Sequence, residues 1–152
     1  MAVTIPMPIR FQLPDGWQPV DPRRSGAPGA AFAAVHEPSR NGRVASITLG
    51  ERTTGTSLAD MADAALGKLV RLGTGVSLTH RQEYDSAVAQ VATLSVGGEK
   101  LVQYQVFLAL DGDHRIVLET ALTATPEQFG QVAKGFGEFV STIRLDEPAV
   151  SR

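Results

Sequence analysis

A run of alternating apolar and polar side chains between residues 87 and 122 constrains the fold more than any other feature. Residues 87–96 and 100–110 alternate with a period of two, which is typical of strands with two distinct faces. Gly97-Gly98 lies between them and favours a two-residue hairpin turn, because both positions tolerate positive φ. A turn at residues 111–113 precedes a third strand over residues 115–122. No helix separates these strands, so we expect an antiparallel meander.

Two amphipathic helices are predicted on either side of this meander in the chain. The first begins near Ser57, its expected cap, and ends at Gly73. The second has Thr125 as cap and Pro126 at its first position, with Gln128 as the reciprocal capping partner. Its apolar stripe consists of Phe129, Val132, Ala133, Phe136, Phe139, Val140 and Ile143. Both helices should therefore cover a sheet, which predicts an α+β layered fold in a single domain.

Shorter strands are predicted elsewhere in the chain. Alternating or apolar residues favour strands at 9–13, 30–36 and 44–51. Trp17 is the only tryptophan and follows a turn at residues 14–16, so we expect it to close one end of the core. The polar strand from Val76 to Tyr84 should lie at a sheet edge. Such an edge could pair with a second copy, which would give a homodimer.

Composition and charge exclude several classes of function. The net charge is -2 and the pI about 5.9, so the chain has no basic excess for nucleic-acid binding. It contains no cysteine, which removes disulfides and thiolate chemistry. No stretch approaches the roughly 20 apolar residues that span a membrane. The first residues do not resemble a signal peptide, so a cytoplasmic location is the default expectation.

No arrangement of residues predicts catalysis or a cofactor. His36, His80 and His114 are far apart in sequence and lack the spacing of a zinc site. The aspartates at residues 111–113 fit a hairpin turn better than a calcium loop, because the other ligand positions are missing. We therefore expect neither an enzyme nor a bound metal or cofactor.

A candidate binding surface involves Trp17, Gln103, Tyr104 and Gln105. The two glutamines share one face of a central strand. They could be covered by a helix, in which case they need hydrogen-bond partners. The favoured interpretation is a sheet face partly open to water, which antiparallel sheets tolerate. The functional interpretation is a binding surface on that face and at its rim near Trp17.

Several segments resemble PsbP-like domains, and most closely the LpqN type found in actinobacteria. The opening segment from Phe11 to Trp17 matches the pattern F-x-L-P-x-G-W. Further similar segments, in the same order, are residues 57–60, 101–107, 117–121, 126–129 and 139–143. The resemblance spans about residues 8–145 of one domain, 1–152. It implies an α/β/α sandwich with a curved antiparallel sheet of six to seven strands and two main helices.

The resemblance also implies a function without catalysis. Members of this superfamily, which includes the DcrB and Eag-chaperone group, serve as assembly factors, binding modules and effector chaperones. We therefore expect a protein- or peptide-binding module, such as a secretion-linked chaperone or assembly factor. An alternative is a small-ligand carrier with a pocket between sheet and helix near Trp17. A third hypothesis is an enzyme whose site is assembled in space.

Overall fold

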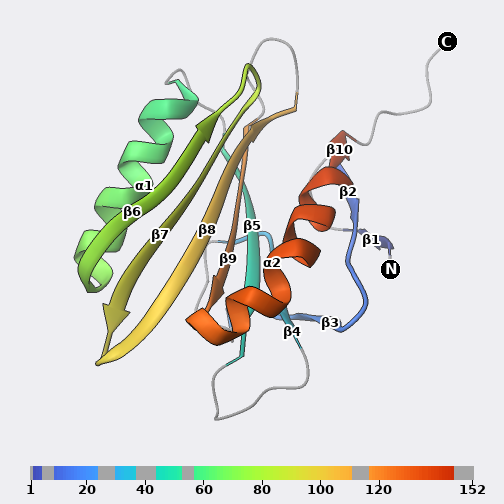
Figure 1. The fold of residues 1–152 in the computed structure, drawn as a ribbon. Coiled ribbons are helices and arrows are strands. Elements are labelled where there is room, and N and C mark those ends of the chain that lie inside the picture. The colour runs from blue at the N-terminus through green and yellow to red at the C-terminus, as the bar shows by residue number, and fades with distance from the viewer. Residues whose placement is uncertain are drawn as a thin grey trace, which may run out of the picture.

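The computed structural model of the protein describes residues 2–4, 9–23, 30–36, 44–52, 57–110 and 117–145. The turn expected at residues 111–113 and the third histidine, His114, lie outside these ranges. Within them, a seven-stranded antiparallel sheet carries one helix on each face, as Figure 1 shows. The predicted α+β sandwich is confirmed.

The main sheet has the strand order β3-β4-β5-β9-β8-β7-β6. In that order the strands are β3 Trp17–Val20, β4 Phe32–His36, β5 Ser46–Arg52, β9 Val117–Ala124, β8 Glu99–Ala109, β7 Ala87–Val96 and β6 Thr74–Glu83. The meander from β6 to β9 is the predicted one, and Gly97 and Gly98 have φ values of 60° and 83° at its central turn. The polar strand β6 is at one edge, as expected. Pairing through that edge stays a prediction.

A second, three-stranded sheet was not predicted. It joins β1 Ala2–Thr4, β2 Ile9–Gln12 and β10 Arg144–Leu145, with β2 in the centre. Phe11 of β2 packs edge-on against Phe32 and Phe139, at ring-centroid distances of 5.0 and 5.2 Å. The small sheet thus brings the two ends of the chain onto one end of the core.

Helix α1, Leu58–Leu72, lies over β6, β7 and β8. Its predicted ends are confirmed: the Asp60 backbone N–H donates to Ser57 Oγ at 3.1 Å, and the Gly73 N–H donates to the Leu69 carbonyl. Glycine at position 73 has a steric reason. A Cβ there would collide with the backbone carbonyl oxygen of Ser95 on β7. Because glycine has no Cβ, the backbone at position 73 can pack closely against β7 where the chain passes from α1 into β6.

Helix α2, Pro126–Ser141, lies on the opposite face, over β8, β9 and β2. The predicted capping box is present, since the side chains of Thr125 and Gln128 each accept a hydrogen bond from the other's backbone N–H. Val132, Phe136 and Phe139 of the predicted stripe are buried. The helix ends just before Ile143, which is buried in the same core.

The two helices are offset across the sheet. Because α1 covers β6–β8 and α2 covers β8 and β9, strands β6 and β7 have no helix above them on the α2 side (Figure 1). A row of cross-strand neighbours on that side shows the effect. His80 is exposed, Val91 and Tyr104 are half-buried, and Leu122 is buried. The side chains on this face of the sheet thus become progressively more exposed to solvent with distance from α2.

Candidate functional site

The two glutamines of the predicted surface lie under α1 in a chain of side-chain hydrogen bonds. Gln105 Nε2 donates to Gln103 Oε1 at 2.6 Å, and Gln103 Nε2 donates to Thr123 Oγ1 at 3.0 Å. On the other side, Gln105 Oε1 accepts a 2.7 Å bond from Gln90 Nε2. Gln105 is only 3% exposed and Gln103 is half-buried. The favoured expectation of a face open to water is therefore wrong for Gln105, and the helix-covered alternative holds.

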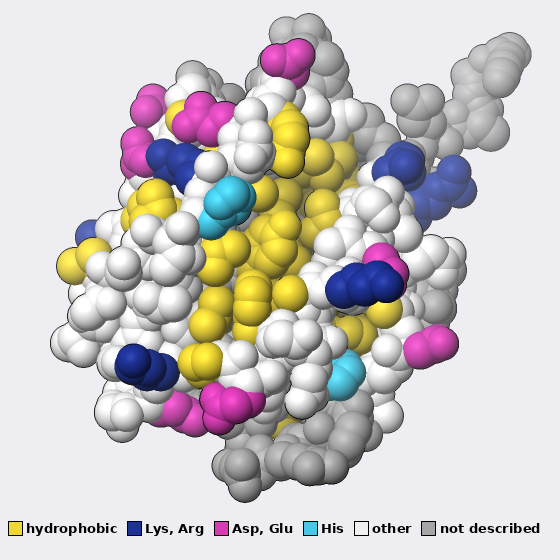
Figure 2. Space-filling model, viewed as in Figure 1, with side chains coloured by type: hydrophobic (Ala, Val, Ile, Leu, Met, Phe, Trp, Pro, Cys, Tyr) yellow, Lys and Arg dark blue, Asp and Glu magenta, His cyan; other side chains and the backbone are white. Residues whose placement is uncertain are grey.

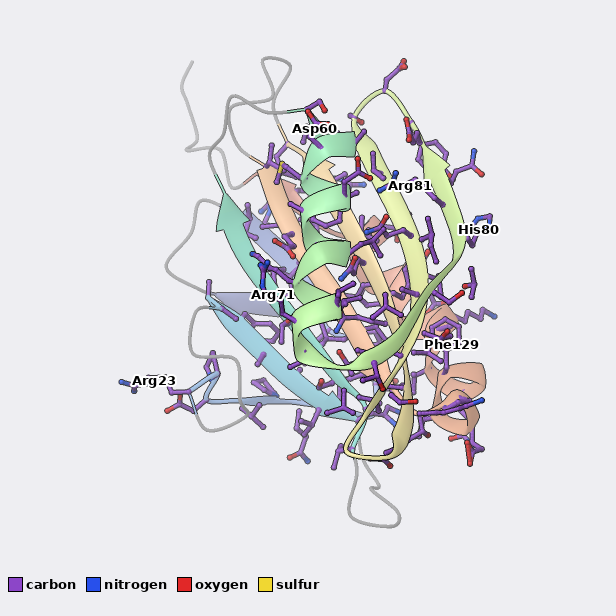
Figure 3. The ribbon with its side chains drawn as sticks, turned by 90° about the vertical axis from the view of Figure 1, so that its left-hand side faces the viewer. Arg23, Asp60, Arg71, His80, Arg81 and Phe129 are labelled. Carbon is purple, nitrogen blue, oxygen red and sulfur yellow. The ribbon has the colours of Figure 1, made fainter. Side chains whose placement is uncertain are left out.

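The chain of bonds continues to the sheet edge through an ion pair. Arg81 Nε of β6 donates to Gln90 Oε1 at 3.0 Å, and its NH2 group donates to Asp63 Oδ1 of α1 at 2.8 Å. Gln90 Nε2 also donates to the Ala62 carbonyl. Figure 3 shows Arg81 between α1 and the sheet, whereas His80, the residue before it, lies toward the other face. These polar groups satisfy one another, so they fasten α1 to the sheet.

Tyr104 and Trp17 lie on the α2 side, apart from the two glutamines. Tyr104 packs against Phe136 and Phe129 of α2, with ring centroids 5.0 and 6.3 Å away. Trp17 approaches a different flank of α2, at Gly135. The structure therefore divides the four predicted residues between two faces. Their role in binding stays a prediction, and Tyr104 and Trp17 belong to separate surfaces.

The first of these surfaces is an apolar strip beside α2. We define the β7–β8 strip as the half-buried side chains Ala89, Val91, Tyr104, Leu108 and Phe129. Figure 2 shows hydrophobic side chains gathered in a hollow on this side of the molecule. On β6, Gln82 is opposite Ala89 and His80 is opposite Val91, so polar groups border the strip at the sheet edge.

The second surface is a pocket beside Trp17. The turn before β3 contains Gly16 at φ 91°, a conformation that favours glycine, and it delivers Trp17 into pairing with His36 of β4. The two rings meet edge to face at 5.0 Å. A pocket of about 470 Å³ lies between this turn, β4 and α2. We call it the Trp17 pocket; its polar lining side chains are Gln12, Asp15, His36, Gln131 and Glu138.

Sequence reasoning missed the part of the Trp17 pocket that α2 contributes. Gln131, Gly135 and Glu138 lie off the apolar stripe, where helical periodicity predicts only contact with solvent. Nothing in their local sequence indicates a pocket, because the opposing wall comes from residues 12–17 and from His36, far earlier in the chain. Asp15 was noted in the sequence only as part of a turn, whereas Trp17 was expected to close one end of the core and to lie beside a binding surface or pocket.

The described residues contain no group of three or more histidine, aspartate or glutamate side chains placed to hold a metal ion. His36 is half-buried beside Trp17 and His80 is exposed at the sheet edge. Neither described helix is long and apolar enough to cross a membrane.

Comparison with known proteins identifies the fold. No protein-family model and no curated protein sequence matches the chain. Among solved structures, LpqN of Mycobacterium tuberculosis, involved in cell envelope biogenesis, matches with a TM-score of 0.65 at 16% identity, over 90% of this chain and 82% of that chain. The yeast Ran-binding protein Mog1p (Saccharomyces cerevisiae) gives 0.64 at 10% identity, over 92% and 91%.

A third match is the cyanobacterial PsbP protein CyanoP from Synechocystis, with a TM-score of 0.60 at 14% identity, over 91% of this chain and 86% of that chain. Identities this low concern the fold and not the activity. All three neighbours have the PsbP-like fold, and the matches cover nearly the whole chain. The protein described here therefore has the fold of the PsbP-like superfamily.

Proposed function

We propose that this protein is a non-enzymatic binding module that docks a protein or peptide partner on the β7–β8 strip. The observation that carries the proposal is the offset of the two helices, which leaves apolar side chains of β7 and β8 half-exposed beside α2. Contiguous apolar surface of this kind is uncommon on soluble proteins outside interaction sites. A secretion-linked chaperone or assembly factor would be one form of such a module.

The shape and surroundings of the strip favour a polypeptide as the occupant. The strip extends along two strands and is bordered by the polar side chains of His80 and Gln82 on β6. An apolar centre with a polar rim is the usual composition of a protein interface. By fold analogy, Mog1p is named as a Ran-binding protein, which fits a protein partner but does not identify one.

Peptide selection against the purified protein tests this proposal. The key variant is Val91→Asp, which places a charge in the centre of the strip. The matched control is Val70→Asp, at an apolar residue of α1 that is 62% exposed and lies on the opposite side of the sheet. We expect selected peptides to bind Val91→Asp at least about tenfold more weakly, the effect of losing roughly 1.4 kcal/mol. Val70→Asp should bind them like the parent protein.

The fold of each variant is verified by its thermal unfolding midpoint. A second variant, Ala89→Lys, repeats the test with a long side chain that can extend toward solvent if Val91→Asp unfolds the sheet. Peptides that bind both strip variants as tightly as the parent would contradict the proposal. So would a selection that yields no peptide sensitive to the strip.

A further inference from the structure

The Trp17 pocket contains a hydrogen-bond donor, the indole N–H of Trp17, that no described residue uses. Trp17 is only 5% exposed. Among the described residues, no group accepts a hydrogen bond from its indole N–H. A buried tryptophan normally finds an acceptor for this group. Because no described group accepts from it, the indole N–H is available to a ligand.

The position of the indole nitrogen places this donor at the pocket. Every fully buried side-chain nitrogen and oxygen among the described residues has a partner. The Nε1 atom of Trp17 has none, so it must be reachable from solvent. It lies where a Cβ on Gly135 would be 3.8 Å away, and both Trp17 and Gly135 line the pocket. The N–H therefore faces the pocket, where an incoming carbonyl oxygen could accept from it.

The charge of the pocket is uniformly negative at its rim. Asp15, from the turn before β3, and Glu138, from α2, both line it, and no lysine or arginine does. Both carboxylates are exposed, and neither has an ion-pair partner within the described part of the chain. Two carboxylates without a cation favour a ligand that carries a positive charge.

We infer that the Trp17 pocket binds a basic segment of a polypeptide. A lysine or arginine side chain lies between Asp15 and Glu138, and a backbone carbonyl of the same segment accepts from the Trp17 indole N–H. The side-chain amides of Gln12 and Gln131, exposed at the pocket, supply donors and acceptors for the neighbouring peptide groups. A volume of about 470 Å³ accommodates one long side chain with its backbone. This site is separate from the β7–β8 strip and does not depend on it.

A single resonance reports on this pocket. Since Trp17 is the only tryptophan, a proton–nitrogen correlation spectrum contains one indole N–H signal. The probes are three blocked pentapeptides that differ only at the middle position: Gly-Gly-Arg-Gly-Gly, Gly-Gly-Gln-Gly-Gly and Gly-Gly-Glu-Gly-Gly. With the arginine peptide we expect a saturable shift of the indole signal below about 10 mM, because a few contacts support millimolar affinity. The glutamine peptide should bind at least about tenfold more weakly.

A double charge variant and a single charge control distinguish this proposal from non-specific peptide binding. Asp15→Asn combined with Glu138→Gln keeps the turn chemistry and the helix but removes the negative charge, and it should abolish the preference for arginine. The control is Glu127→Gln, an exposed residue at the start of α2 that does not line the pocket. Glu127→Gln should bind the arginine peptide like the parent protein.

The outcomes are distinct. Equal shifts with the arginine and glutamine peptides would overturn the inference, and so would an indole signal that does not shift saturably with any probe. Neither result would affect the β7–β8 strip, which is tested by different peptides and by Val91→Asp. A preference that survives in the double variant would show that the carboxylates are not the recognition element, and would equally overturn it.

Discussion

Gln90 Nε2 donates a 2.7 Å hydrogen bond to Gln105 Oε1, and both side chains are buried between α1 and the sheet. The pair joins β7 to β8, and through the Ala62 carbonyl it also joins β7 to α1. A one-residue slip of either strand would turn its glutamine to the other face and break this bond. The buried amides therefore specify the strand register as well as the position of the helix.

Removing one partner of this pair should destabilise the protein. Gln90→Leu leaves Gln105 Oε1 buried without its donor, which costs about 1–3 kcal/mol of the free energy of unfolding. Combining it with Gln105→Leu should cost less than the sum of the two single changes, because both amides then leave the core. Urea denaturation of the four proteins measures the coupling. Gln82→Leu, on the exposed side of β6, is the control and should change stability by less than about 0.5 kcal/mol.

The junction between α1 and β6 should be intolerant of any side chain at position 73. Gly73→Ala forces the new Cβ into the Ser95 carbonyl oxygen, so the helix end or β7 must move. We expect a loss of about 1–3 kcal/mol, the usual cost of overpacking. Gly67→Ala is the matched control, because nothing lies within 4 Å of its Cβ position in the same helix. The free energy of unfolding of that control, measured by thermal or urea unfolding, should rise by about 0.5–1 kcal/mol. A Gly73→Ala variant as stable as the parent protein would contradict the predicted collision with the Ser95 carbonyl oxygen.

The capping box of α2 should contribute measurably to stability. Thr125 Oγ1 accepts from the Gln128 N–H at 3.2 Å, and Gln128 Oε1 accepts from the Thr125 N–H at 3.0 Å. Thr125→Ala should lower the free energy of unfolding by about 1 kcal/mol. Thr125→Ser retains the hydroxyl and should lose much less. An equal loss in both variants would assign the effect to the methyl group and not to the cap.

The sequence predicted the elements with local signals and missed those that depend on distant contacts. The caps at Ser57 and Thr125 and the Gly97-Gly98 turn were all predicted correctly, because neighbouring residues determine them. Strand β3 was missed: it contains Pro19, lies at the sheet edge and is defined by pairing with β4. The small sheet was missed because it too is defined by pairing between distant residues: its strands come from both ends of the chain.

The candidate surfaces were only partly predictable. Alternation placed Gln103 and Gln105 on one face of β8, but it could not show that α1 covers them, since that depends on where the helix docks. Tyr104 falls on the opposite face by the same alternation. The unused N–H of Trp17 required the structure, because a missing acceptor is visible only when all neighbours are placed.

Position 135 separates the stability of α2 from access to the Trp17 pocket. Gly135→Ala should raise the free energy of unfolding by about 0.5–1 kcal/mol, because alanine favours a helix more than glycine. Its Cβ would lie 3.8 Å from Trp17 Nε1, an ordinary contact that the fold accepts but that partly covers the indole N–H. Arginine-peptide binding should therefore weaken several-fold while the protein becomes more stable.

The matched control for this change is Gly137→Ala, whose Cβ position has no neighbour within 4 Å. It should give the same gain in stability and leave the indole shift and the affinity for the arginine peptide unchanged. Unfolding curves and the peptide titration, measured on the same samples, compare the two variants directly. If Gly135→Ala bound the peptide as tightly as Gly137→Ala, the indole N–H would not be part of the binding site.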